Sequence, residues 1–155
     1  MAGSAPTAGV PFPPPLAYLA GLLIGVALEI AFPVDPLPTV ITVVGAVVGI
    51  GGSLLLDVGA MQRFSRAKTP AIPFKPSTAL VTSGPYRITR NPMYLGMALL
   101  YVGLAFAFGL VWAFAVLPVV VIVIDRLVIA REEPYLERLF GEEYRAYKTR
   151  VRRWI

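Results

Sequence analysis

Four long apolar segments dominate the pattern of hydrophobic and polar positions along the chain. They cover residues 16–32, 38–61, 94–108 and 110–130, and each contains at most two charged residues. A helix that crosses the hydrocarbon core of a bilayer needs about 20 predominantly apolar residues. The pattern therefore predicts four transmembrane helices, of which the last two form a tight antiparallel hairpin because only Gly109 separates them.

The segments between and after these helices are polar, basic or rich in proline. Apolar residues in the last segment recur three or four positions apart, which predicts an amphipathic helix that begins at Pro134. The predicted fold class is an all-α integral membrane protein with about four transmembrane helices and a C-terminal amphipathic cytoplasmic helix. Its single domain divides into a flexible Pro-rich N-terminus (1–15), two transmembrane helices (16–61), a cytoplasmic loop (62–93), a transmembrane hairpin (94–130) and a C-terminal cytoplasmic helix with a basic tail (131–155).

The composition supports a membrane protein and excludes several kinds of site. Hydrophobic residues make up 57% of the chain and charged residues 15%, against about 45–50% and about 25% in a typical soluble domain. Cysteine and histidine are both absent. Their absence excludes a disulfide framework, a thiolate metal site and a nucleophile activated by histidine, and we expect no bound metal.

The distribution of charge predicts the topology. All fourteen basic residues lie in the segments 62–93 and 126–155, which four spans place on the same side of the membrane. The positive-inside rule makes that side cytoplasmic, so both termini should face the cytoplasm. Eleven of the fourteen are arginine and the chain is rich in alanine and valine, which favours a prokaryotic cell membrane.

Small residues mark one face of the second predicted helix. Gly45, Gly49, Ser53 and Asp57 recur at every fourth position. A Gly-rich nucleotide-binding loop would need a strand before it and a helix after it, and here the glycines lie within one apolar run. Small residues at this spacing allow membrane helices to approach closely, so we interpret the face as a helix-packing surface.

Three acidic residues lie within or at the edges of the predicted spans, namely Glu29, Asp57 and Asp125. A charge at the centre of a bilayer costs at least about 2.5–3.5 kcal/mol, which makes such residues candidates for function. Glu29 lies near the outer end of its helix and is interpreted as structural. For Asp57 and Asp125 two interpretations stay open, an ion pair with a nearby arginine or a wall of a binding site. The arginines considered for these pairs are Arg63, Arg66 and Arg126.

Two polar blocks carry the candidate chemistry. In the first, prolines stiffen the loop before the third helix, and Pro92 suits the first turn of that helix, whose N-terminal amides can bind a carboxylate or phosphate. In the second, Glu132 and Glu133 precede the helix predicted to begin at Pro134. Each block also has a simpler interpretation, the first as a basic loop on anionic lipid and the second as the charged end of a helix on the membrane surface.

Several motifs follow one another in a fixed order through these two blocks. They are Gly84-Pro-Tyr-Arg87, Arg90-Asn-Pro-Met-Tyr-Leu-Gly96, Glu132-Glu133, Leu136, Phe140-Gly141, Tyr144 and Tyr147. This order and spacing resemble the isoprenylcysteine carboxyl methyltransferase family, which is related to the phospholipid N-methyltransferases, over about residues 69–154. Where the family commonly has Arg-His-Pro, this chain has Asn91, so a mechanism that uses the histidine as a base is excluded here.

The resemblance implies an integral membrane methyltransferase that uses S-adenosylmethionine and releases S-adenosylhomocysteine. Its donor site lies at the cytoplasmic ends of the last two membrane helices and is closed by the C-terminal helix. In that site the acidic pair would bind the ammonium or ribose hydroxyls of the donor, Arg90 would bind its carboxylate, and tyrosines would pack on its adenine or sulfonium. The candidate cofactor-binding residues are Gly84, Pro85, Tyr86, Arg90, Asn91, Pro92, Tyr94, Glu132, Glu133, Tyr144 and Tyr147, and the candidate catalytic residues are Arg90, Asn91 and Arg126.

The acceptor stays open between two chemistries. A lipid-soluble carboxylate, or another group that is already nucleophilic, needs no base, and Arg90 or Arg126 would supply a cation for it. A phospholipid amine must first lose a proton, so it is the alternative. A non-catalytic membrane scaffold with a basic amphipathic tail is the alternative from another class. The expected partners are the lipid bilayer and a lipophilic small-molecule acceptor, with no nucleic acid, and the oligomeric state is left open.

Overall fold

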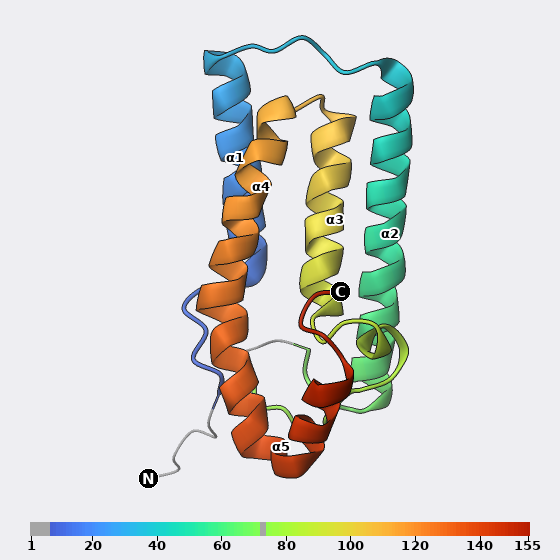
Figure 1. The fold of residues 1–155 in the computed structure, drawn as a ribbon, viewed down its shortest axis with the longest axis vertical. Helices are drawn as coiled ribbons and strands as arrows, with labels where there is room; N and C mark the ends of the chain where they lie inside the picture. The colour runs from blue at the N-terminus through green and yellow to red at the C-terminus, as the bar shows by residue number, and fades with distance from the viewer. Residues whose placement is uncertain (1–6, 72–73) are drawn as a thin grey trace.

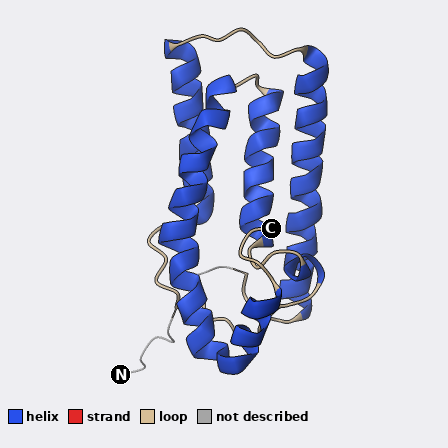
Figure 2. Ribbon diagram, viewed as in Figure 1, coloured by secondary structure: helices blue, strands red, loops and turns tan. Residues whose placement is uncertain are grey.

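The computed structural model describes residues 7–71 and 74–155, which contain helices and no strands (Figure 2). Four membrane helices, α1 to α4, lie side by side along the long axis of the molecule (Figure 1). This arrangement confirms the predicted all-α fold class. The predicted flexible N-terminus includes residues 1–6, which lie outside the described residues. The elements are α1 (Pro14–Ala31), α2 (Thr39–Arg66), the 3-10 helix η1 (Gly84–Arg87), α3 (Pro92–Ala107), α4 (Val111–Ile124), the π-helical segment η2 (Asp125–Ile129) and α5 (Ala130–Arg150).

The four membrane helices pack as two pairs, α2 along α3 and α1 along α4. α1, α2 and the helical stretch Val111–Arg150, which is kinked at Gly141, are each long and apolar enough to cross a membrane. α3 is a shorter apolar helix of 16 residues, which corresponds to about 24 Å. The connections between α1 and α2 and between α3 and α4 lie at one end of the bundle (Figure 1). The segments that carry all the basic residues lie at the other, which we call the basic end.

The C-terminal helix does not begin at Pro134, and this prediction is wrong. The helix runs without interruption from α4 through η2 into α5, with Pro134 inside it, and turns only at Gly141, where φ is +54°. A proline inside a helix costs about 3 kcal/mol. Packing outweighs that cost here, because Val128, Ile129 and Tyr135 on either side of Pro134 are all buried.

The apolar stripe of α5 packs on the protein rather than on a lipid surface. Tyr144 and Tyr147 are buried together with Ala60 of α2 and Tyr86 of η1. This cluster is separate from the apolar core between the membrane helices. The end of α5 therefore closes the basic end of the bundle.

The small face of α2 makes the close approach that its spacing predicts. A Cβ atom added at Gly49 would lie 2.6 Å from the backbone of Gly103 in α3, and one at Gly45 would lie 2.4 Å from the ring of Phe106. Gly51 points away from this interface, and nothing lies within 4 Å of a Cβ atom added there. Direct contact between the two backbones thus fixes α2 against α3.

Two of the acids in the spans have local roles. The carboxylate of Glu29 accepts hydrogen bonds from the amides of Val34 at 3.4 Å and Trp112 at 3.2 Å, which joins the connection after α1 to the first turn of α4 and agrees with its structural interpretation. Asp57 accepts a hydrogen bond from the hydroxyl of Ser53 at 2.9 Å. Among the described residues Asp57 forms no ion pair, so the ion-pair interpretation is wrong for it.

The contact between Gly49 and Gly103 leads to a test with a matched control. We expect Gly49→Ala to destabilise the protein by roughly 1–3 kcal/mol, because the added methyl group overpacks a backbone contact. Gly51→Ala introduces the same group into open space and should leave stability unchanged or slightly higher. Thermal unfolding of the two variants in the same detergent measures the difference. Equal melting temperatures would contradict the proposed packing.

The topology can be tested by cysteine labelling, since the native chain contains no cysteine. Asp35 and Glu143 are both exposed acidic residues, in the connection between α1 and α2 and in α5 respectively. A membrane-impermeant maleimide added to intact cells should label Asp35→Cys and should not label Glu143→Cys until the cells are lysed. Labelling of Glu143→Cys in intact cells would reverse the predicted orientation.

Candidate active site

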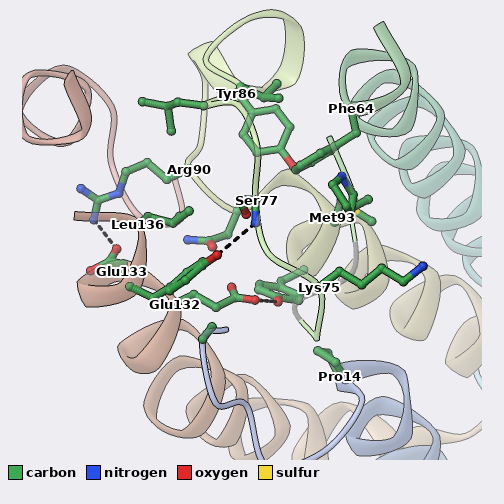
Figure 3. A pocket seen from close by; sticks show the side chains of 18 of the residues that line it. Pro14, Phe64, Lys75, Ser77, Tyr86, Arg90, Met93, Glu132, Glu133 and Leu136 are labelled. Atoms are coloured by element: carbon green, nitrogen blue, oxygen red, sulfur yellow. Dashed lines mark hydrogen bonds and ion pairs between the residues drawn. The ribbon is translucent and has the colours of Figure 1, made fainter. Parts of the chain in front are cut away.

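A cavity of about 350 Å³ opens at the basic end of the bundle (Figure 3). Its wall comes from segments far apart in the sequence: the start of α1, the end of α2, the loop that follows it, the start of α3 and α5. Most side chains in this wall are apolar or aromatic, and a few polar groups converge on it. Those polar groups include Arg90, Asn91, Glu132 and Glu133, all of them predicted site residues.

Glu133 is buried and paired with two arginines. Its side chain is 7% exposed, and its Oε1 accepts a hydrogen bond from Arg90 Nη2 at 2.7 Å. Arg153 donates to the same carboxylate from Nε at 3.1 Å and from Nη2 at 2.6 Å. Both carboxylate oxygens are therefore satisfied, and Glu133 serves as an ionic anchor within the wall of the cavity.

Glu132 points in a different direction from its neighbour. In Figure 3, Glu133 faces Arg90 at one edge of the cavity, whereas Glu132 points away from Arg90. Its Oε1 accepts a hydrogen bond from the hydroxyl of Tyr94 at 2.7 Å. Among the described residues Glu132 forms no ion pair. The site thus holds one neutralised carboxylate and one without a cationic partner.

The pKa of Glu132 reflects this setting. Burial disfavours the charged form and raises the pKa of Glu132 to about 7. The hydrogen bond from Tyr94 acts in the opposite direction, and the negative charge of Glu133 adds to the increase. A carboxyl with this pKa changes charge near neutral pH, as the acids and bases of active sites often do.

Arg90 and Asn91 are held by the end of the chain. Arg90 Nη1 donates to the carbonyl of Lys148 at 3.2 Å, and its backbone amide donates to the carbonyl of Arg152 at 2.9 Å. Asn91 Nδ2 donates to the carbonyl of Arg153 at 3.0 Å. The side chain of Arg90 is only 9% exposed. Its position is therefore fixed before any ligand enters the cavity.

Four of the predicted site residues in the wall are tyrosines, namely Tyr86, Tyr94, Tyr144 and Tyr147, and the wall also contains Tyr135, Phe64 and Phe74. The hydroxyl of Tyr147 donates to the carbonyl of Tyr86 at 2.7 Å. Burial raises the pKa of the Tyr86, Tyr144 and Tyr147 hydroxyls well above the usual value, so these side chains stay neutral. Neutral aromatic faces suit a planar base or a cation.

The structure places eight of the twelve predicted site residues in the wall of the cavity, and four lie elsewhere. Gly84 and Pro85 form the turn into η1, with φ of Gly84 at +66°, and pack on Arg63 and Gly59 of α2. Pro92 is buried at the first turn of α3. The side chain of Arg126 is 79% exposed and lies 3.7 Å from Asp125. The four residues outside the cavity wall are Gly84, Pro85, Pro92 and Arg126.

Two residues that organise the site were missed in the sequence. The buried hydroxyl of Tyr135 accepts a hydrogen bond from the amide of Ser77 at 3.0 Å and fixes the loop over the cavity. Arg153 pairs with Glu133 and with Asp125. The ion pair considered for Asp125 thus forms mainly with Arg153, at 3.1 Å, while Arg126 lies farther away. No local pattern distinguishes Arg153 from the seven other basic residues of segment 126–155.

Two comparisons with known proteins found matches. A family model described as phospholipid methyltransferase matches residues 40–143, about two thirds of the chain. An uncharacterized protein of Haemophilus influenzae is 43% identical over 63 residues, which are 41% of this chain and all of that protein. No solved structure matches. Among the described residues there is no acidic cluster that could hold a metal ion.

Proposed function

Because the chain belongs to the phospholipid methyltransferase family, we propose that it transfers a methyl group from S-adenosylmethionine to a lipid-soluble acceptor at the basic end of its bundle. The family match confirms the resemblance read from the motifs, and it makes the protein a membrane methyltransferase of the phospholipid and isoprenylcysteine type. The donor, the residues that bind it and the acceptor are the parts that we propose.

The observation that carries the proposal is the pair of carboxyl groups with different partners. Arg90 and Arg153 neutralise Glu133, so Glu132 is the carboxyl left for a cationic ligand. S-adenosylmethionine carries an ammonium and a sulfonium, and Glu132 with the aromatic wall suits both. A non-catalytic scaffold would have no use for an acid of raised pKa inside an apolar cavity.

The residues of the chain align the reactants rather than react with them. The donor supplies the methyl group, which passes to the acceptor by in-line displacement. Tyr86, Tyr144 and Tyr147 would hold the flat part of the donor, and the apolar wall formed by Phe64, Met93 and other residues would exclude water. Holding two reactants in line can supply a large part of the rate enhancement without any catalytic base.

For the acceptor we propose first a lipid-soluble group that is already nucleophilic, such as a carboxylate. Such a group needs no base. Neither arginine proposed to stabilise a carboxylate is free for it inside the cavity. Arg90 is already paired with Glu133, and Arg126 is exposed and lies outside the cavity wall. The first proposal therefore relies on Asn91 as a donor at the cavity wall.

One observation favours a second candidate, a phospholipid amine. Glu132 lines the cavity with a pKa of about 7, which suits it to accept a proton from an ammonium. The sequence offers no histidine for this step, and for this second candidate we propose Glu132 as the proton acceptor. The description of the matching family points in the same direction.

Donor binding provides the first test. Since the charged form of Glu132 binds the ammonium, affinity for S-adenosylhomocysteine should increase as pH rises from 5.5 to 7 and level off above that. Glu132→Gln should remove the pH dependence and weaken binding by roughly 1.5–3 kcal/mol. Titration calorimetry of the detergent-solubilised protein measures both effects, and Glu143→Gln, at an exposed position, is the control. No binding by the wild-type protein at any of these pH values would refute the function.

The pH dependence of turnover separates the two acceptors. With saturating donor between pH 7.5 and 8.5, where Glu132 is already ionised, the rate should be flat for a carboxylate acceptor. For an amine it should rise about tenfold per pH unit below the effective pKa of the amine. The assay uses labelled donor with extracted lipids and small isoprenoid acids, and mass spectrometry identifies the product. A steep rise with label on an amine headgroup would replace the first acceptor by the second.

A further inference from the structure

Residues 151–155, which we call the strap, follow α5 and return to the start of α3 (Figure 1). The backbone of the strap is hydrogen-bonded to residues 89–91, which lead into α3. The carbonyl of Arg153 accepts hydrogen bonds from Thr89 Oγ1 at 2.9 Å and from Asn91 Nδ2 at 3.0 Å. Thr89 is fully buried. The strap is thus an integral part of the structure beside the cavity.

The side chain of Arg153 bridges two acids from different elements. Its Nη1 donates to both oxygens of Asp125, at 3.2 and 3.1 Å, while Nε and Nη2 donate to Glu133. Asp125 also accepts a hydrogen bond from the indole of Trp154 at 3.0 Å. Asp125 begins the π-helical segment η2, and Glu133 lies in α5. Arg153 therefore attaches the strap to η2 through Asp125 and to α5 through Glu133.

We propose that Arg153 is a positioning residue for the donor site: through Glu133 it sets the place of Arg90, and through its carbonyl it sets the place of Asn91. The proposal rests on the proposed function. Arg153 itself does not line the cavity, whereas Arg90, Asn91 and Glu133 do. Its effect on the donor must then pass through the residues that it holds.

The balance of charge explains why an arginine is needed at this point. Asp125, Arg153, Glu133 and Arg90 form a row of alternating charges that sums to zero. Without the Arg153 guanidinium, Glu133 keeps one of its three hydrogen bonds, the one from Arg90. Glu133, beside Glu132, would then be held by one guanidinium instead of two, and the position of the Arg90 guanidinium that pairs with it would be less tightly fixed. Both changes disturb the groups that face the donor.

The test measures S-adenosylhomocysteine binding to the full-length protein in nanodiscs by calorimetry, together with its thermal unfolding. Arg153→Gln should raise Kd at least about tenfold, the loss expected when hydrogen bonds between charged groups are removed. Arg153→Lys should recover part of the affinity, because an ammonium can pair with one of the two acids. Arg152→Gln removes the same charge from the exposed neighbouring side chain and should change Kd less than about twofold.

A purely structural role would lower the melting temperature and leave the affinity of the folded protein unchanged. Wild-type affinity of folded Arg153→Gln would therefore overturn the proposal. If that variant does not fold, Arg153→Lys takes its place, since one ammonium cannot replace both hydrogen bonds to Glu133 and the contact with Asp125. A raised Kd in folded Arg153→Lys supports the proposal and a wild-type Kd overturns it. Absence of binding by the wild-type protein would instead refute the proposed function, and this proposal with it.

Discussion

The ion pairs of Glu133 with two arginines are the interaction on which the basic end of the molecule depends. A buried carboxylate without partners would be strongly destabilising, but here charged donors satisfy both of its oxygens. One partner, Arg90, comes from the segment that enters α3, and the other, Arg153, comes from the strap. Three segments far apart in the sequence therefore fix one another around a single carboxylate. The cavity wall depends on that arrangement, because it contains Glu133, Arg90 and Asn91, and Asn91 is hydrogen-bonded to the Arg153 carbonyl.

Glu132 and Glu133 show how helix geometry gives two identical side chains different properties. Successive residues of an α-helix point about 100° apart, so the two carboxylates face different surroundings. Glu133 meets guanidinium groups, whereas Glu132 meets the hydroxyl of Tyr94 and the apolar cavity. Two guanidinium groups donate hydrogen bonds to the first, whereas burial raises the pKa of the second to about 7. The site gains a group that changes charge at neutral pH without any histidine in the chain.

The membrane helices provide the frame that keeps these segments in register. The backbones of α2 and α3 touch at Gly49 and Gly103, and Gly25 of α1 packs on Ala113 of α4 in the same way. At the basic end the hydroxyl of Tyr18 donates to the carbonyl of Tyr94 at 2.9 Å and joins α1 to α3. At the opposite end Glu29 joins the connection after α1 to the first turn of α4. Direct backbone contact and a few buried hydrogen bonds leave the helices little freedom to shift, so the site is built on a rigid support.

The sequence by itself determined the membrane helices, the packing face of α2 and the two motif blocks that identify the family. These features are local: a span is a continuous apolar run, and a packing face is a fixed spacing of small residues. The tertiary structure decided where the last helix begins, because burial on both sides of Pro134 outweighs a local preference. It also decided which of eight basic residues near the C-terminus reaches Glu133. Such a partner is chosen by the path of the chain in space, and no spacing in the sequence encodes it.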